Sequence, residues 1–220
     1  MEFEELLGEL RKEASQAAWH IGFLKVAVEE SELIASRLND SYSGYAGIIA
    51  ESAVKASVIL YCARAWDMSS DAVSLRRMLR HLPPLENLLQ HKVSRLSESG
   101  IDVDKRKFED RYNIVMDRYR EIENDGVHSA VRVLRTEFFA HRIIESKDRH
   151  NLKAAGQDVS GLTYDSLLKL AIGTVMLVGE IGYLRDGLAN PFRGQLSYAE
   201  ECCREFWKRV PRLSEAEDPR

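Results

Sequence analysis

An arginine and a histidine in the second half of the chain have types and a spacing that could do chemistry together. They are Arg135 and His141, with five residues between them, in the segment VRVLRTEFFAHR at residues 131–142. In a straight α-helix their side chains would point about 120° apart over a rise of roughly 9 Å. A guanidinium and an imidazole so placed do not stack. They can converge on one group between them, or on a facing copy of the same helix.

An arginine and a histidine together suit the cleavage of RNA without a metal ion. RNA carries its own nucleophile, the 2′-hydroxyl, and a histidine can remove that proton or protonate the 5′-oxygen leaving group. An arginine can hold the phosphate through two N–H groups and stabilise the extra charge of the transition state. The expected products are a 2′,3′-cyclic phosphate and a 5′-hydroxyl, and DNA should resist because it lacks the 2′-hydroxyl.

The apolar pattern predicts that the pair lies on a helix. Val127, Val131, Leu134 and Phe138 follow steps of four and three, which marks one helical face, and His141 is the next step on that stripe. The same pattern allows a purely structural interpretation. The histidine would then be a core residue bonded to a carbonyl or to a nearby carboxylate, and the arginine would be a surface residue.

The predicted helix lies in a locally basic part of an acidic chain. The net charge of −4 argues against non-specific coating of nucleic acid. Between residues 126 and 153, however, six Lys or Arg stand against three acids, and three of the six histidines are there as well. Four arginines could extend a groove for RNA, although such faces are more often merely solvated: Arg132, Arg142, Arg76 and Arg77.

The pair resembles the signature of the HEPN superfamily (higher eukaryote and prokaryote nucleotide-binding domains). That signature is an arginine, four to six residues and a histidine, usually after a small residue, late in a helix. Here Ala140 precedes the histidine. The segments ILYCARAWD (residues 59–67) and SLRRML (residues 74–79) are similar to the abortive-infection, AbiU-like branch. The resemblance covers roughly residues 48–184.

The resemblance implies an all-α, HEPN-like helical bundle and, in catalytic members, a two-fold homodimer that brings two copies of Arg135 and His141 into one cleft. It also implies that Asp67 orients the arginine, although Asp67 could simply bind backbone amides at a helix end. We count Thr136 and Glu137 as supporting residues, and Glu137 is also the carboxylate that could pair with a structural His141. Catalytic members often have Asn, Asp or His where this chain has Thr136, which favours a non-catalytic member.

Other chemistries lack their signatures in this chain. There is no Glu-x-x-His of a di-iron bundle, no phosphate-binding Gly-rich loop, no Gly-x-Ser-x-Gly and no Cys/His zinc spacing. The three cysteines, two of them adjacent, form no disulfide framework. We therefore expect no metal and no cofactor.

Apolar stripes and breakers predict helices and no strand, and so an all-α bundle with an N-terminal helical extension. We expect a helical segment over residues 1–40 packed on a HEPN-like domain over 41–213, followed by a loose tail at 214–220. The helix over 45–66 is apolar nearly all round, which predicts a buried, central position. Residues 145–161 are expected to form a long polar loop.

Location and partners follow from the same composition. The acidic N-terminus lacks the order of a secretion signal, and Lys169 and Glu180 interrupt the most apolar run, so we expect a cytoplasmic protein without a membrane contact. Two functions stay open. One is an endoribonuclease of a phage-defence or toxin–antitoxin system, with an antitoxin or nucleotidyltransferase partner. The other is a non-catalytic HEPN dimer that binds RNA, a nucleotide or a partner protein.

Overall fold

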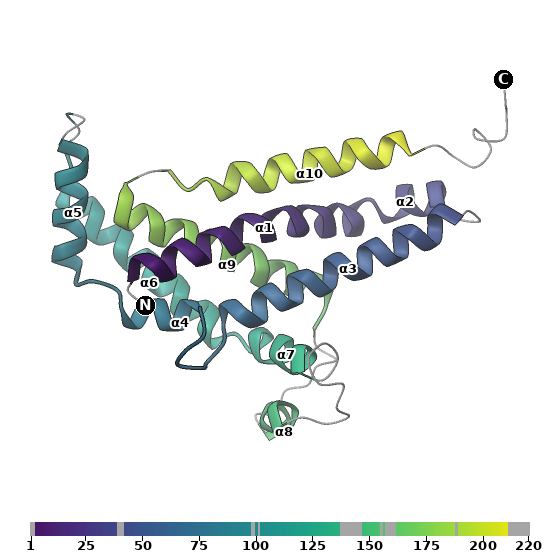
Figure 1. Ribbon diagram of the computed structural model, residues 1–220, viewed down its shortest axis with the longest axis horizontal. Coiled ribbons are helices and arrows are strands. Elements are labelled where there is room, and N and C mark those ends of the chain that lie inside the picture. Colours follow the sequence, from purple (N-terminus) through teal and green to yellow (C-terminus); the bar gives the residue numbers. More distant parts are fainter. Residues whose placement is uncertain are drawn as a thin grey trace.

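Ten α-helices and no strand make up the part of the chain that the computed structural model describes, and the predicted all-α class is confirmed (Figure 1). That part comprises residues 3–38, 42–97, 100, 102–136, 147–154, 156, 162–187 and 189–210. The helices are α1 (Phe3–Glu29), α2 (Ser31–Leu38), α3 (Tyr42–Ala65), α4 (Leu75–Arg80), α5 (Leu85–Ser97), α6 (Lys105–Asn124), α7 (Val127–Leu134), α8 (Lys147–Ala154), α9 (Tyr164–Asp186) and α10 (Phe192–Arg209).

Two long helices, α1 and α9, form the centre of the bundle. Helix α1 packs against α3, α9 and α10, and Figure 1 shows it running between α3 and α10. Each fully buried aliphatic side chain in such a core contributes about 1.5–3 kcal/mol to stability. The largest in these two helices are Leu6, Leu7, Leu10, Ile21, Leu24, Leu167, Leu177, Ile181 and Leu184.

The ends of α9 follow from local sequence. Thr163 accepts a hydrogen bond from the backbone N–H of Ser166, and the Ser166 hydroxyl accepts one from the backbone N–H of Thr163, which forms a capping box. Gly187 ends the helix in the left-handed conformation at φ 73°, which glycine adopts without strain. The sequence alone predicts both ends, because threonine is typical of an N-cap and Gly187 follows the apolar run, and both are observed.

The N-terminal helical segment shares the main core. The buried side chains of α1 belong to the same apolar cluster as those of α3, α6 and α9. The sequence suggests a break near Gly22, but α1 continues through it. A Cβ at Gly22 would lie 2.7 Å from the Cβ of Ala199 on α10, so the glycine permits close packing of two helices. The predicted domain boundary at residue 40 and the predicted tail lie outside the described residues.

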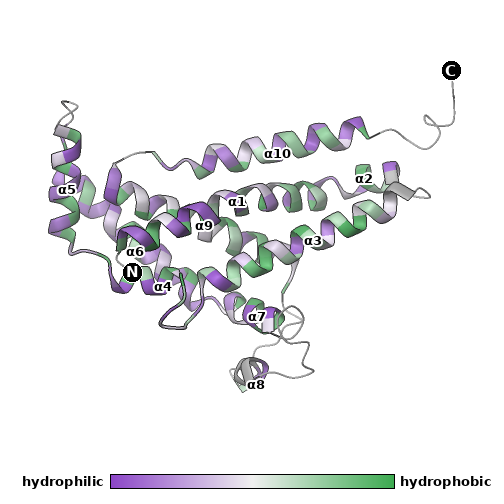
Figure 2. Ribbon diagram, viewed as in Figure 1, coloured by the Kyte–Doolittle hydropathy of each residue, from purple (hydrophilic) through white to green (hydrophobic). Residues whose placement is uncertain are grey.

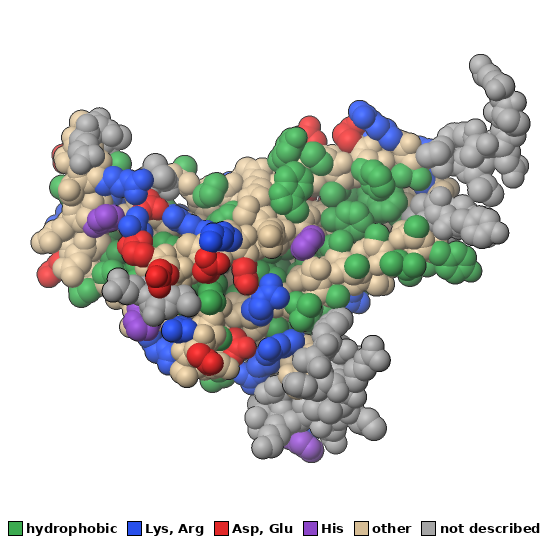
Figure 3. All heavy atoms as spheres, viewed as in Figure 1, with side chains coloured by type: hydrophobic (Ala, Val, Ile, Leu, Met, Phe, Trp, Pro, Cys, Tyr) green, Lys and Arg blue, Asp and Glu red, His purple; other side chains and the backbone are tan. Residues whose placement is uncertain are grey.

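Helix α3 is buried in its second half and exposed in its first. Val58, Ile59 and Cys62 are buried, whereas Ile48 and Ile49 are 63% and 69% exposed. The prediction of a helix buried along its whole length is therefore wrong. Apolar composition shows that a helix can be buried, but which part of it is buried depends on the helices that pack beside it. Figure 2 colours the ribbon of this half of α3 mostly as hydrophobic, and Figure 3 shows hydrophobic side chains on that part of the surface.

Two helix boundaries differ from the prediction. Helix α8 lies within the predicted polar loop of residues 145–161. Its eight residues have no apolar stripe, so periodicity could not detect it, although Lys, Arg, Leu and Ala favour helix. Helix α10 begins at Phe192, directly after Pro191, rather than at Tyr198. A proline is well suited to the start of a helix because its fixed φ is already helical.

Among the residues that the structure describes, two helices are long and apolar enough to cross a membrane by length and composition. They are Gly44–Ala65, with 28% of its apolar window buried inside the protein, and Tyr164–Asp186, with 72% buried. The second value is typical of the core helix of a globular bundle.

Candidate functional site

The arginine of the signature forms an ion pair with an aspartate from a distant part of the chain. Arg135 lies just after α7, and Asp67 lies just after α3. The Nη1 atom of Arg135 is 3.3 Å from Oδ2 of Asp67. Oδ1 of the same carboxylate accepts a hydrogen bond of 2.9 Å from the backbone N–H of Ser69. Asp67 therefore closes the end of α3 and holds Arg135, so the two roles considered for it are compatible.

The surroundings of Asp67 favour its charged form on balance. Partial burial raises the pKa of this carboxyl group, but the hydrogen bonds from Ser69 and the positive charges of Arg135 and Arg132 lower it by more. The net pKa lies below the ordinary value for an aspartate. The carboxylate is therefore ionised at neutral pH and can hold the guanidinium.

Trp66 fixes the backbone that carries Asp67. Its indole N–H donates a hydrogen bond of 2.9 Å to Oγ1 of Thr174 on α9, and the Thr174 hydroxyl donates one of 2.7 Å to the carbonyl of Leu170. The indole also stacks on the ring of Tyr119 on α6, with centroids 5.6 Å apart and an interplanar angle of 20°. The position of Asp67 is thus tied to α6 and α9.

Helix α7 presents a polar stripe with the arginine at its end. His128, Arg132 and Arg135 are four and three residues apart, so they share one face of the helix. The opposite side is apolar, with Ala130, Val131 and Val133 buried. This division of α7 into a buried and a polar face orients the arginines toward Asp67.

His128 is a member of this stripe that sequence reasoning gave no role. Its ring lies 6.0 Å from the ring of Trp66, and its Nδ1 is hydrogen-bonded to the carbonyl of Asp125. A carbonyl can only accept, so Nδ1 carries the proton and Nε2 has the lone pair in the neutral ring. Nε2 is 3.5 Å from the hydroxyl of Ser129. The only signal in the sequence was the spacing of His128 from the two arginines.

His128 is held in its neutral form. Burial lowers its pKa most strongly, and the nearby charges of Arg132 and Arg76 lower it further against the opposing hydrogen bond to Asp125. Because the net pKa is below the ordinary value of a histidine, the ring is uncharged at neutral pH. A neutral imidazole of this kind can accept a proton.

The two candidate arginines of α4 have different surroundings. Nη2 of Arg76 is 2.8 Å from Oε1 of Glu123, which also accepts a hydrogen bond of 2.8 Å from the hydroxyl of Tyr119. Arg77 donates to the backbone carbonyls of Asp71 and Ala72 in the connection before α4. Arg76 therefore belongs to the surroundings of His128, whereas Arg77 stabilises a loop.

The remaining predicted site residues include three that lie outside the described residues: Glu137, His141 and Arg142. Thr136 is described, is partly exposed and directly follows Arg135. Within the described ranges, no group of three or more His, Cys, Asp or Glu side chains is arranged to hold a metal ion.

The all-α fold agrees with the fold that the HEPN resemblance implies. Over residues 1–201 the chain matches the family model of the AbiU2 HEPN domains, and it belongs to that family. The match begins at the first residue and includes α1, α2 and most of α10, so it is wider than residues 48–184. No curated protein and no solved structure matches the chain.

Proposed function

We propose that this protein is a metal-independent endoribonuclease of a phage-defence or toxin–antitoxin system, in which Arg135 and His141 act at a composite site between two copies of the chain. The observation that carries the proposal is the ion pair between Asp67 and Arg135. It gives the arginine of the HEPN signature a fixed position. Membership of the family supports the same assignment.

The chemistry assigned to each residue follows from its type. A guanidinium has five N–H donors, so one that is held on one edge by a carboxylate can bind a phosphate with another edge. Arg135 would hold the scissile phosphate and stabilise the charge of the transition state. His141 would remove the proton of the 2′-hydroxyl or protonate the leaving 5′-oxygen. Asp67 would act as a positioning residue through Arg135.

The proposal includes the setting of the reaction. The protein would work as a cytoplasmic homodimer on an RNA substrate, with an antitoxin or a nucleotidyltransferase as its regulating partner. Arg132 and Arg142 would add phosphate contacts beside the reacting pair, and Arg76 would add one from α4. Because Arg77 is engaged with backbone carbonyls, its contribution to RNA binding would be smaller.

The test is incubation of purified protein with end-labelled single-stranded RNA in the presence of chelator. We expect fragments ending in a 2′,3′-cyclic phosphate, and a loss of at least about 100-fold in rate for Arg135→Ala and for His141→Ala. Arg120→Ala, an exposed arginine of α6, and His150→Ala, an exposed histidine of α8, are matched controls that should retain the rate. Cleavage that survives both site variants would overturn the assignment.

A second candidate function is a non-catalytic HEPN dimer that binds RNA, a nucleotide or a partner protein. It is favoured by the presence of Thr136 after the arginine and by the pairing of Arg135 with Asp67 inside one chain, which could serve stability alone. If RNA stays intact with a folded, dimeric protein and still binds to it, this second function replaces the first.

A further inference from the structure

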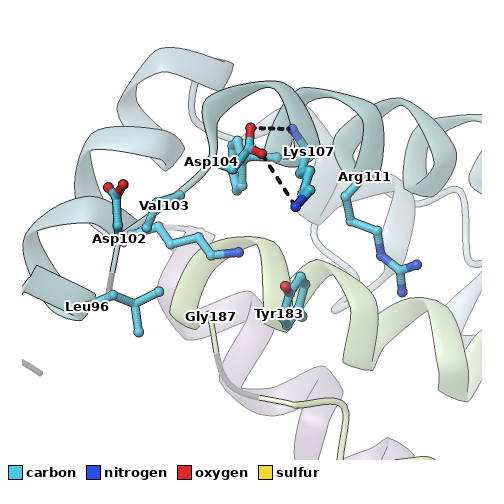
Figure 4. Close-up of a pocket in the computed structure, with 10 residues that line it drawn as sticks. Leu96, Asp102, Val103, Asp104, Lys107, Arg111, Tyr183 and Gly187 are labelled. Carbon is cyan, nitrogen blue, oxygen red and sulfur yellow. Dashed lines mark hydrogen bonds and ion pairs between the residues drawn. The ribbon is translucent and has the colours of Figure 1, made fainter. Parts of the chain in front are cut away.

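A pocket lies at the end of the molecule away from α7. It is lined by the end of α5, the beginning of α6 and the end of α9, and it has a volume of about 360 Å³ (Figure 4). Figure 1 shows α5 and α6 at one end of the bundle, with α7 beneath its middle. Small-molecule sites in proteins have volumes of roughly 300–1,000 Å³, so this pocket is large enough for a small ligand.

The wall of the pocket contains a buried lysine. Lys92 is only 6% exposed, and its ammonium group lies 4.0 Å from the ring centroid of Tyr183 and 5.0 Å from that of Phe108. Across the described ranges, no carboxylate lies within ion-pair distance of it. Contacts with aromatic rings return about 0.5–2 kcal/mol. The ammonium group faces the pocket, so an anion that enters the pocket can reach it.

A second cation faces the same aromatic ring. The guanidinium carbon of Arg111 is 5.9 Å from the ring centroid of Tyr183. Arg111 shares the single carboxylate of Glu180 with Arg118, since both contact its Oε1 atom. The Nε atom of Arg111 is buried and has no hydrogen-bond partner among the described residues. Arg111 is thus paired with Glu180, whereas Lys92 has no ion pair within the described part of the chain.

Two aspartates line the outer part of the pocket without neutralising Lys92. Asp104 caps α6 by accepting a hydrogen bond of 3.2 Å from the backbone N–H of Lys107, and its other oxygen lies 3.6 Å from Nζ of the same residue. Figure 4 marks both contacts with dashed lines. Asp102 is exposed, and in Figure 4 its carboxylate points away from Tyr183. Neither aspartate therefore forms an ion pair with the ammonium group of Lys92.

We propose that this pocket binds a small phosphate-bearing molecule, with its phosphate between Lys92 and Arg111 beside the ring of Tyr183. The ammonium of Lys92 and the guanidinium of Arg111 both lie near the ring of Tyr183, so an anion bound beside that ring would be attracted to both charges. A phosphate can accept hydrogen bonds from both cations at once. This site is separate from the Asp67–Arg135 pair and does not depend on the proposed nuclease activity.

The experiment compares ligands and variants of the full-length protein by titration calorimetry and thermal unfolding. The probes are inorganic phosphate, adenosine 5′-monophosphate and adenosine, at constant ionic strength. Lys92→Met and Arg111→Gln remove the two cations. Lys105→Met is the matched control, because Lys105 is an exposed lysine of the first turn of α6 that does not line the pocket.

We expect the two phosphate-bearing probes, and not adenosine, to bind the wild-type protein and raise its Tm. Their affinity should fall roughly 10- to 100-fold in Lys92→Met and in Arg111→Gln, and it should be unchanged in Lys105→Met. Tighter binding of the nucleotide than of phosphate would show that the pocket also holds the rest of the molecule, whereas equal binding would show that it holds the phosphate alone.

Three results would overturn the proposal. The first is that neither phosphate-bearing probe binds the folded wild-type protein at millimolar concentration. The second is that Lys92→Met binds them as tightly as the wild type. The third is a lower Tm for Lys92→Met without any phosphate binding, which would assign Lys92 to the stabilisation of the carbonyl end of α9.

Discussion

The two ends of α6 lie in regions that differ in how their positively charged side chains are paired. Near its C-terminal end, the signature arginine and Arg76 each face a carboxylate of their own, Asp67 and Glu123. Near its N-terminal end, Lys92 is buried against aromatic rings, and Arg111 shares one carboxylate with a second arginine. A carboxylate of the same chain holds the side chain of a paired cation in one orientation. A buried cation without such a carboxylate can instead bind an anionic ligand.

This difference assigns different tasks to the two regions. In the Asp67–Arg135 region the protein supplies the counter-ion and so holds the guanidinium in place. The proposed nuclease reaction would require charge that is preorganised in this way. In the Lys92 pocket the counter-ion is missing, so binding energy is available to a ligand. Removing a group from an ion pair should therefore destabilise the protein, whereas removing Lys92 should stabilise it.

The largest expected effect on stability comes from removing the carboxylate that Arg111, in the pocket wall, shares with Arg118. Glu180 is 4% exposed, and Glu180→Gln leaves Arg111 and Arg118 without a counter-ion. We expect a loss of about 3 kcal/mol in the free energy of unfolding, measured by urea denaturation. A loss below about 0.5 kcal/mol would mean that the arginines move to solvent, and that the wall carries no uncompensated charge.

The next effect has the opposite sign. In phosphate-free buffer, Lys92→Met should stabilise the protein by about 1–2 kcal/mol, because an apolar chain of similar length replaces a buried ammonium without a counter-ion. Added inorganic phosphate should reduce the difference by stabilising only the wild type. Thermal unfolding with and without phosphate measures both quantities. A variant less stable than the wild type in both buffers would contradict the contrast between the regions.

A smaller effect is expected where the ion pair is complete. Asp67→Asn should cost about 1 kcal/mol, since the pair is partly exposed. The folded-state pKa of Asp67 is below its ordinary value, so this stabilisation is present above the unfolded-state pKa and is lost as the pH falls through the folded-state pKa. Urea denaturation from pH 7 down to pH 3 should show the wild type and the variant converging in acid. A difference that stays constant would assign the effect to packing.

The smallest effect belongs to an exposed charge outside both regions. Lys105→Met removes a lysine whose side chain is 69% exposed and whose contact with Glu109 is a surface pair. The change in stability should stay within about 0.5 kcal/mol, and RNA cleavage and phosphate binding should not change. An effect as large as that of Lys92→Met would show that net charge, rather than burial, governs the pocket.

The sequence predicted much of the architecture because its signals are local. The cap at Thr163, the left-handed Gly187 and the apolar stripes determine where helices begin, end and face, and each can be recognised within a few residues. The exposure of Ile48 on α3 was not predictable in this way. It depends on which helices lie beside that half of α3, and neighbours are set by the whole chain.

The candidate site was partly predictable for a similar reason. The relation of Arg135 to Asp67 came from the HEPN resemblance, whereas the helix before it was predicted from the apolar pattern. The structure places the two side chains in contact across 68 positions of sequence. His128 was overlooked because its spacing from Arg132 and Arg135 shows only that the three share a helix face, and its contact with Trp66 depends on the fold. Lys92 gave no signal at all, since the rings that cover it come from α6 and α9.

The proposal of a site shared between two chains is best tested by complementation between two inactive forms of the protein. Arg135→Ala and His141→Ala would be purified separately, mixed under conditions that exchange subunits, and assayed on end-labelled RNA in chelator. We expect the mixture to regain cleavage with 2′,3′-cyclic phosphate ends, because a mixed dimer contains an intact arginine and an intact histidine at one composite site. A mixture that forms mixed dimers yet stays as inactive as each variant alone would contradict a site shared between two chains.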